Sequence, residues 1–177
     1  MYLFETERLH VRRLEMGDAE GMHSIYGDAL SMEFVGDGLP LPIEACRHWV
    51  EVTDRNFKRR GYGMVGAIEK STGELIACAG IVHPSQQEEP EIKYAIRRDK
   101  WGLGFATELV TALVSFAQSS LAKTWLMATV NPAHIRSQSV LTKAGFRRGA
   151  DRVNEDGSLT QVWTIQLGDE SLSPDGG

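Results

Sequence analysis

A glycine-rich turn between a predicted strand and a predicted helix constrains this chain more than any other feature. The stretch Glu91–Ile96 reads as a strand, and Gly102 and Gly104 stand directly before an amphipathic helical pattern. A helix start offers unpaired backbone N–H groups and the positive end of the helix dipole, so it attracts anions. Glycines allow that backbone to approach a phosphate with no side chain in between. The pattern therefore predicts a site for a phosphate-bearing cofactor.

Two common nucleotide-binding loops do not fit these residues. A dinucleotide-binding loop reads G-x-G-x-x-G, but Thr107 occupies the place of the last glycine, and the strand Trp125–Val130 does not end in an acidic residue. A phosphate-binding loop of the G-x-x-x-x-G-K-S/T kind needs a lysine and a hydroxyl residue after its second glycine, where Phe105 and Ala106 stand. The loop must follow another pattern.

The stretch Trp101-Gly-Leu-Gly-Phe-Ala106 resembles the Q/R-x-x-G-x-G/A acyl-CoA pyrophosphate loop of the GNAT N-acetyltransferase superfamily, with Trp at the first position. Extended to Glu108, it looks like the loop of the Rim-type ribosomal-protein N-terminal (alanine/serine) acetyltransferases. The resemblance covers residues 5–167. It is supported, in chain order, by Thr6-Glu-Arg-Leu-His-Val-Arg12, Glu91-Ile-Lys-Tyr-Ala-Ile96 and Ser137-Gln-Ser-Val-Leu-Thr-Lys-Ala-Gly-Phe146.

The resemblance implies an α+β, single-domain GNAT fold. Its mixed, mostly antiparallel sheet is flanked by helices and splayed between the fourth and fifth strands, which end at Ile96 and Val130. The mixed element order with one strand–helix–strand crossover independently favours an α+β domain. The domain is expected over residues 1–167, and residues 168–177 lack a hydrophobic pattern and are expected to form a disordered tail.

Periodicity predicts the remaining elements. We expect helices over 18–28 and from Pro42 through Lys58, and strands over 62–69, Leu75–Val82, 146–152 and 161–167. In the helix after Pro42, the residues expected on or near one face are Ala45, Trp49, Val52 and Phe57. In the helix after the glycines, the predicted core stripe is Ala106, Leu109, Val110, Leu113 and Ala117.

Composition narrows the function classes. The chain has 177 residues, 42% of them hydrophobic, and a net charge of −5, which argues against nucleic acid as a direct partner. No apolar run is long enough to span a bilayer. Cys46 and Cys78 read as reduced core thiols, and no histidine has metal-ligand spacing. We therefore expect a cytoplasmic monomer or homodimer without a metal.

The cofactor expected from the resemblance is acetyl-CoA, as co-substrate. Backbone groups around Ile96 would bind the pantetheine arm as an added strand would be bound. The resemblance places His134 and Ser137 beside the thiol end and Lys143 among the cofactor-binding residues. The residues expected to wrap the pyrophosphate are Trp101, Gly102, Leu103, Gly104, Phe105, Ala106 and Thr107.

Acyl transfer to an amine requires an unprotonated amine and help for the departing thiolate. Glu91 is the candidate base, acting through water, or else a structural hydrogen-bonding residue. Ser137 is the candidate acid, and it could instead, or in addition, cap the helix that runs through Lys143. Leu141 stands where many GNAT proteins have a tyrosine acid, and His134 where many have Asn. His134 could bind pantetheine, act as the base, or be a solvated loop histidine.

The acceptor is expected to be a primary amine that attacks acetyl-CoA directly in a ternary complex, and the resemblance implies a protein N-terminal α-amine. An α-amine, with a pKa near ~8, needs less help than a lysine near ~10.4. Phe34 and Glu91 are the candidate acceptor-binding residues. Phe34 and Trp49 could line a cleft or belong to the core, and the acidic stretch 88–91 could attract a cation or be solvated surface. The sequence leaves open a small-molecule amine (aminoglycoside, polyamine or amino acid), a non-catalytic acyl-CoA sensor, and an interaction module that kept only the fold.

Overall fold

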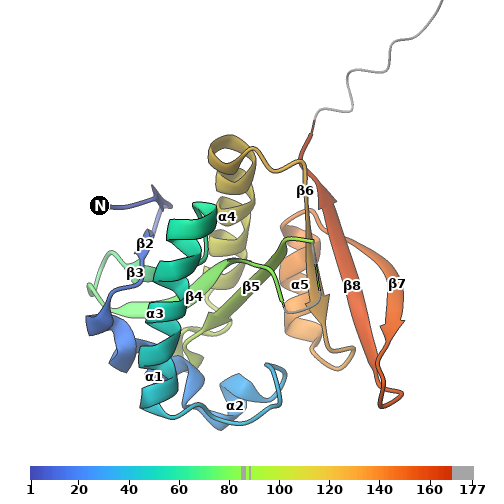
Figure 1. Ribbon diagram of the computed structural model, residues 1–177, viewed down its shortest axis with the longest axis horizontal. Helices are drawn as coiled ribbons and strands as arrows, with labels where there is room; N and C mark the ends of the chain where they lie inside the picture. Colours follow the sequence, from blue (N-terminus) through green and yellow to red (C-terminus); the bar gives the residue numbers. More distant parts are fainter. Residues whose placement is uncertain (85–86, 88, 169–177) are drawn as a thin grey trace, which may run out of the picture.

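A single eight-stranded sheet organises the chain in the computed structural model, which describes residues 1–84, 87 and 89–168 (Figure 1). The predicted tail lies outside these residues, apart from Gly168. The sheet order is β1-β2-β3-β4-β5-β6-β8-β7. The strands are β1 Phe4–Glu5, β2 Leu9–Arg13, β3 Met64–Glu69, β4 Leu75–Val82, β5 Glu91–Ile96, β6 Trp125–Val130, β7 Arg147–Val153 and β8 Leu159–Gln166.

The helices cover both faces of this sheet. One hydrophobic cluster joins α4 and α5 to Ala77 and Ala79 of β4, and a second joins α1 and α3 to Cys78 of the same strand. Since successive residues of a strand point to opposite faces, a central strand covered on both sides must be apolar throughout, as β4 is. The helices are α1 Ala19–Tyr26, α2 Ala29–Met32, α3 Ile43–Arg60, α4 Phe105–Leu121 and α5 Ile135–Lys143, with short 3₁₀ turns at Met16–Asp18 and Arg98–Lys100.

The sheet opens between β5 and β6, as expected from the resemblance. These parallel strands share one ladder pair, Glu91 with Met127, whereas every residue of β5 is paired with β4. Figure 1 shows β6, β8 and β7 diverging from β4 and β5 beyond that point. The predicted fourth and fifth strands are β5 and β6 because the short β1 was not expected. The expected α+β architecture, one mixed sheet flanked by helices and open between these two strands, is therefore confirmed.

The predicted boundaries hold with small shifts, but the face of α3 does not. Its buried residues are Cys46, Val50 and Thr53, while Trp49 is exposed and Val52 only half-buried. The predicted face is therefore displaced by one residue from the core, and it has another use, described below. The helix expected over 18–28 is divided between the Met16–Asp18 turn and α1, and the stripe of α4 is buried except for the half-buried Ala106.

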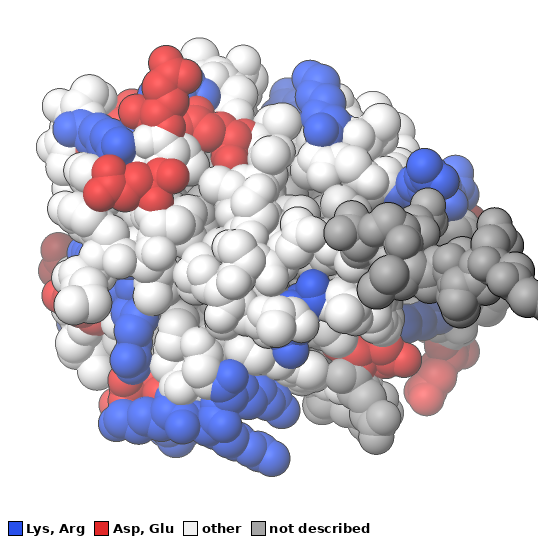
Figure 2. Space-filling view, turned by 90° about the horizontal axis from the view of Figure 1, so that it is seen from above, with Lys and Arg blue, Asp and Glu red and all other residues white. Residues whose placement is uncertain are grey.

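Charged side chains lie in separate groups on the surface. Figure 2 shows Lys and Arg along the edges of the face it presents, Asp and Glu in other groups, and a largely uncharged middle. One basic group ends α3, where Lys58, Arg59 and Arg60 suit the negative end of the helix dipole. None of the helices within residues 1–84, 87 and 89–168 is long and apolar enough to cross a membrane.

Candidate active site

The glycine turn forms an open helix start. Gly102 and Gly104 have φ values of 76° and 86°, a region that side chains other than glycine rarely adopt. Gly104 is the N-cap of α4, and the first intrahelical bond runs from the Glu108 N–H to the Gly104 carbonyl at 3.1 Å. The amides of Phe105, Ala106 and Thr107 precede that bond, so they can donate to an anion. The residues present thus fit a pyrophosphate.

The first turn of α4 is clamped to the N-terminal strands. Arg8 pairs with Glu108 at 2.6 Å, donates to the Leu103 carbonyl at 2.9 Å and lies over the Phe105 ring at 4.0 Å. Glu108 also accepts from the Thr6 hydroxyl at 2.5 Å. Arg8 therefore neutralises a carboxylate beside the expected anion site, and it explains why the stretch from Thr6 and the stretch from Trp101 belong to one pattern.

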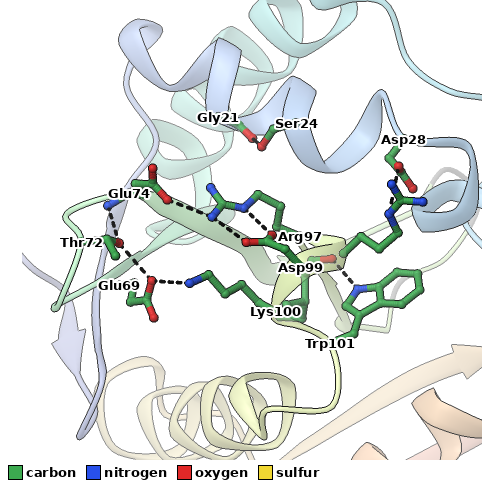
Figure 3. Close-up of polar contacts among 12 residues, drawn as sticks. Gly21, Ser24, Asp28, Glu69, Thr72, Glu74, Arg97, Asp99, Lys100 and Trp101 are labelled. Atoms are coloured by element: carbon green, nitrogen blue, oxygen red, sulfur yellow. Dashed lines mark hydrogen bonds and ion pairs between the residues drawn. The ribbon is translucent and has the colours of Figure 1, made fainter.

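The chain leading into the turn is held by ion pairs (Figure 3). Arg97 donates to Asp99 at 2.7 Å and to Glu74 at 2.9 Å, and these hydrogen bonds raise its pKa. Lys100 donates to Glu69 at 2.7 Å and lowers the pKa of that carboxyl. These cations are committed to carboxylates, so they position the turn and are poorly placed to hold phosphate.

Trp101 forms a hydrogen bond with the Ile96 carbonyl, one of the backbone groups that were expected to bind the cofactor. Its indole N–H donates to the Ile96 carbonyl at 2.7 Å (Figure 3). The prediction that free groups around Ile96 bind pantetheine is therefore corrected for this carbonyl, and it still applies to the rest of the β5 edge beyond Glu91. On its other side the Trp101 ring meets the Arg136 guanidinium at 5.0 Å from the centroid. Leu103 and Lys143 are exposed.

A pocket of about 510 Å³ passes through the opening between β5 and β6. From one face of the sheet it is lined by α1, α3 and the loop after α2, and from the other by α5. The residues of α3 that line it are Trp49, Val52, Thr53 and Asn56, which share one side of the helix. Two of the four residues expected on or near one face of this helix, Trp49 and Val52, are therefore pocket wall, since a pocket wall and a core both require apolar residues at helical spacing.

Ser137 and Tyr94 meet in this pocket. Their hydroxyl oxygens lie 2.7 Å apart, and both residues line the cavity. Burial raises the pKa of Tyr94 to about 12, so the phenol is protonated at neutral pH and can donate. Ser137 is not the N-cap of α5. That position belongs to His134, so the predicted capping role is wrong, and the hydroxyl engages Tyr94 instead.

His134, at the start of α5, contacts the loop after α2, where the acceptor is expected. Its ring stacks on Phe34 with centroids 4.7 Å apart, and both side chains line the pocket. Burial, and then the nearby Arg136, lower the pKa of His134. The imidazole is therefore neutral at pH 7, and can accept a proton or a hydrogen bond. Of the readings left open, the solvated loop histidine is wrong, because the ring is half-buried against Phe34.

Glu91 is held inside the protein. Its side chain is 2% exposed, and it accepts from the Lys93 ammonium and the Thr129 hydroxyl. Lys93 also donates to Thr129 at 3.0 Å, and Lys93 and Thr129 line the pocket, whereas Glu91 does not. Its predicted direct contact with the acceptor is corrected for this reason. Its role as a base acting through water stays a prediction.

Lys93, Tyr94 and Thr129 are site residues that the sequence reasoning missed. Tyr94 lies within the strand that carried the resemblance, but its partner Ser137 is 43 positions away. The sequence did contain a signal for them. Successive residues of a strand point to opposite faces, so Lys93 and Tyr94 lie on the two faces of β5, beside the edge where the sheet opens. Within the described part of the chain, no group of three or more His, Cys, Asp or Glu side chains could hold a metal ion.

Comparison with known proteins identifies the family. A family model described as the acetyltransferase (GNAT) domain matches residues 8–147. The uncharacterized protein YkkB of Bacillus subtilis (strain 168) is 33% identical over 144 residues, which cover 80% of this chain and 83% of YkkB. The uncharacterized N-acetyltransferase p20 of Bacillus licheniformis is 25% identical over 166 residues, covering 92% and 93%.

Solved structures show the same fold with different acceptors. RimL, a ribosomal L7/L12 α-N-protein acetyltransferase in complex with coenzyme A, gives a TM-score of 0.79 at 13% identity, covering 94% of this chain and 98% of its own. A spermidine N-acetyltransferase SpeG chimera from Vibrio cholerae and hSSAT gives 0.74 at 16%, covering 91% and 96%. YncA from Salmonella typhimurium, solved with acetyl-CoA, gives 0.72 at 18%, covering 97% and 100%.

Proposed function

The chain belongs to the GNAT acetyltransferase domain family and is an acetyl-transferring enzyme, and from this premise we propose that it acetylates the α-amine of a protein or peptide N-terminus. Acetyl-CoA is the donor, and the amine attacks it directly while both substrates are bound. One observation carries the proposal: the Ser137 hydroxyl, hydrogen-bonded to Tyr94 at 2.7 Å, opens onto the pocket that joins the α5 side to the acceptor side.

In this proposal the donor enters from the face covered by α4 and α5. The amides of residues 102–107 hold the pyrophosphate, whereas the Trp101 amide donates to the Arg98 carbonyl at 3.1 Å, which corrects the prediction for that residue. The β5 edge left unpaired by β6 holds the pantetheine arm. Lys143 and Arg136 are cations on the exposed side of α5, next to the arm and adenosine phosphates. The thioester then lies beside Ser137 and His134.

The chemistry asks little of the protein. The amine nitrogen forms a bond to the thioester carbonyl carbon, and the carbon–sulfur bond breaks. The thiolate takes the proton of the Ser137 hydroxyl, Ser137 takes the proton of Tyr94, and the phenolate is reprotonated from solvent. Tyr94, protonated because burial raises its pKa to about 12, donates to Ser137 and supports that transfer. The amine proton leaves to neutral His134 or to solvent, with Glu91 acting through Thr129 as the second candidate.

An α-amine acceptor, as in the Rim-type branch, suits a site without a strong base. Its pKa near ~8 leaves a useful fraction unprotonated at neutral pH, in contrast to a lysine near ~10.4. The ordered motifs that resemble the Rim-type branch support this choice. RimL, which shares the fold, is described as an α-N-protein acetyltransferase.

The test is thiol release from acetyl-CoA with a panel of amines. Short peptides with free α-amines should be acetylated, and the same peptides with blocked N-termini should not, even when they contain lysine. A preference for lysine ε-amines, spermidine or aminoglycosides would overturn the acceptor and leave the donor chemistry standing. Absence of turnover with every amine, at intact acetyl-CoA binding, would instead favour a non-catalytic acyl-CoA sensor.

A further inference from the structure

The side chains and charges at the acceptor end of the pocket indicate which kind of N-terminal residue can carry the reacting amine. Building on the proposed function, we infer that the enzyme selects N-termini whose first side chain is large and apolar and carries no second positive charge. In this first residue it would differ from the alanine/serine Rim-type branch that its motifs resemble. The inference depends on two independent properties of the wall: the side chains that α1, α3 and the loop after α2 present to the cavity, and the charges that line it.

The wall facing α5 is apolar and aromatic. From α3 it presents Trp49 and Val52, and Trp49 packs edge-on against Tyr26 of α1 with ring centroids 5.2 Å apart. Phe34, stacked on His134, closes the side nearest the reacting atoms. These aromatics surround a space continuous with the position of Ser137. An amine placed beside Ser137 therefore directs its neighbouring side chain into this wall.

Among the described residues, the pocket lining provides no carboxylate to receive a second ammonium. No Asp or Glu of residues 1–84, 87 and 89–168 is among the lining residues, whereas the Lys93 ammonium is, and the His134 imidazole in the same lining is neutral. The nearest buried carboxylate, Glu91, is already paired with Lys93. Behind His83, Tyr62 holds a further cation, since Lys123 donates to the Tyr62 hydroxyl at 3.1 Å and His83 meets the same hydroxyl at 2.7 Å. Glu33 acts electrostatically on His134 but does not line the pocket, so a polyamine would bring a cation to a lining without a carboxylate to pair with it.

The same wall assists catalysis. Desolvation disfavours the charged form of an amine, so an apolar pocket beside Lys93 binds the neutral amine in preference to the ammonium. The neutral form is the nucleophile. Selection of an apolar first residue and selection of the reactive protonation state are therefore two effects of one surface, and no strong base is required.

The experiment uses the full chain and peptides that differ only in residue one. Phe- and Leu-first peptides should exceed the Lys-first peptide in kcat/KM by roughly tenfold or more, because an apolar pocket discriminates by about that factor. Spermidine should be poorer than phenethylamine. Asn56→Asp, which places a carboxylate in the wall, should narrow or reverse that ranking. His48→Asp is the matched control, since His48 lies on the exposed side of the same helix and should leave it unchanged.

Three outcomes distinguish this inference from the proposed function. Turnover of all first residues within threefold of one another, or a preference for Lys-first peptides or spermidine, would overturn the inference while acetyl transfer to amines stands. An apolar preference confined to free arylalkylamines would keep the inference for the pocket and overturn the protein N-terminus. If no amine turns over, calorimetric binding of phenethylamine against 1,6-diaminohexane to the CoA-loaded enzyme decides, and tighter binding of the diamine would refute it.

Discussion

Substitution of Lys93 by Met measures how much the Lys93–Glu91 ion pair contributes to the free energy of unfolding. The Glu91 side chain is 2% exposed, and Lys93 provides its charged partner, alongside the neutral donors Thr129 and Gln87. Removing one partner of a fully buried pair costs about 3–5 kcal/mol. The Lys93 side chain is 44% exposed, and the neutral donors remain, so we expect a smaller loss of about 1–3 kcal/mol in the free energy of unfolding.

The assay is urea unfolding followed by circular dichroism, arranged as a double-mutant cycle. Glu91→Gln combined with Lys93→Met should cost less than the sum of the single changes, with a coupling of about 1–2 kcal/mol. Lys58→Met is the matched control, because Lys58 is 73% exposed and pairs with Asp54 on the surface, where the loss should stay below about 0.5 kcal/mol. Equal losses for Lys93→Met and Lys58→Met would refute the reasoning.

Kinetics of Glu91→Gln then separate position from proton transfer. A general base contributes about 10²–10⁴-fold to the rate. If Glu91 positions Lys93 and Thr129, turnover of Glu91→Gln should fall by much less than that range. In both Glu91→Gln and Lys93→Met, the fall in turnover should then parallel the loss in the free energy of unfolding. A loss of 10³-fold in kcat in a variant of full stability would return Glu91 to the role of base.

The remaining predictions concern the donor, the acid and pH. Gly104→Val should abolish acetyl-CoA binding, because φ is 86° there and the new side chain would stand at the phosphate-binding amides, and calorimetry on the folded variant checks this. Ser137→Ala should lower kcat by ~10²-fold at unchanged acetyl-CoA affinity, and Tyr94→Phe should lower it less. Full activity of Ser137→Ala would reassign the acid. The rate should rise with pH to a plateau near the α-amine pKa of ~8. Because the pKa of His134 is lowered, its protonation affects the profile only at more acidic pH, and His134→Asn should leave the limb near 8 in place.

The sequence predicts the donor side of the site better than the acceptor side, for a physical reason. The residues of the glycine turn and α4 are neighbours in the chain, so local pattern is enough to locate them. The hydroxyl pair of Ser137 and Tyr94 depends on how α5 sits against β5, which no local pattern contains. Trp49 and Val52 show a further limit, because an apolar stripe at helical spacing predicts burial equally well whether the stripe meets other side chains or a cavity.

The single ladder pair between β5 and β6 also has a mechanical consequence. The sheet consists of two blocks, β1 to β5 and β6 to β8, joined by backbone hydrogen bonds at one end and bridged elsewhere by helix packing. A pantetheine arm that lies in this opening, hydrogen-bonded to the β5 edge, would stiffen the connection between the two blocks. We expect amide hydrogen exchange in β5 and β6 to slow together when acetyl-CoA is added, and exchange in the outer hairpin β7–β8 to change little. The donor would then be a structural element of the enzyme for as long as it is bound.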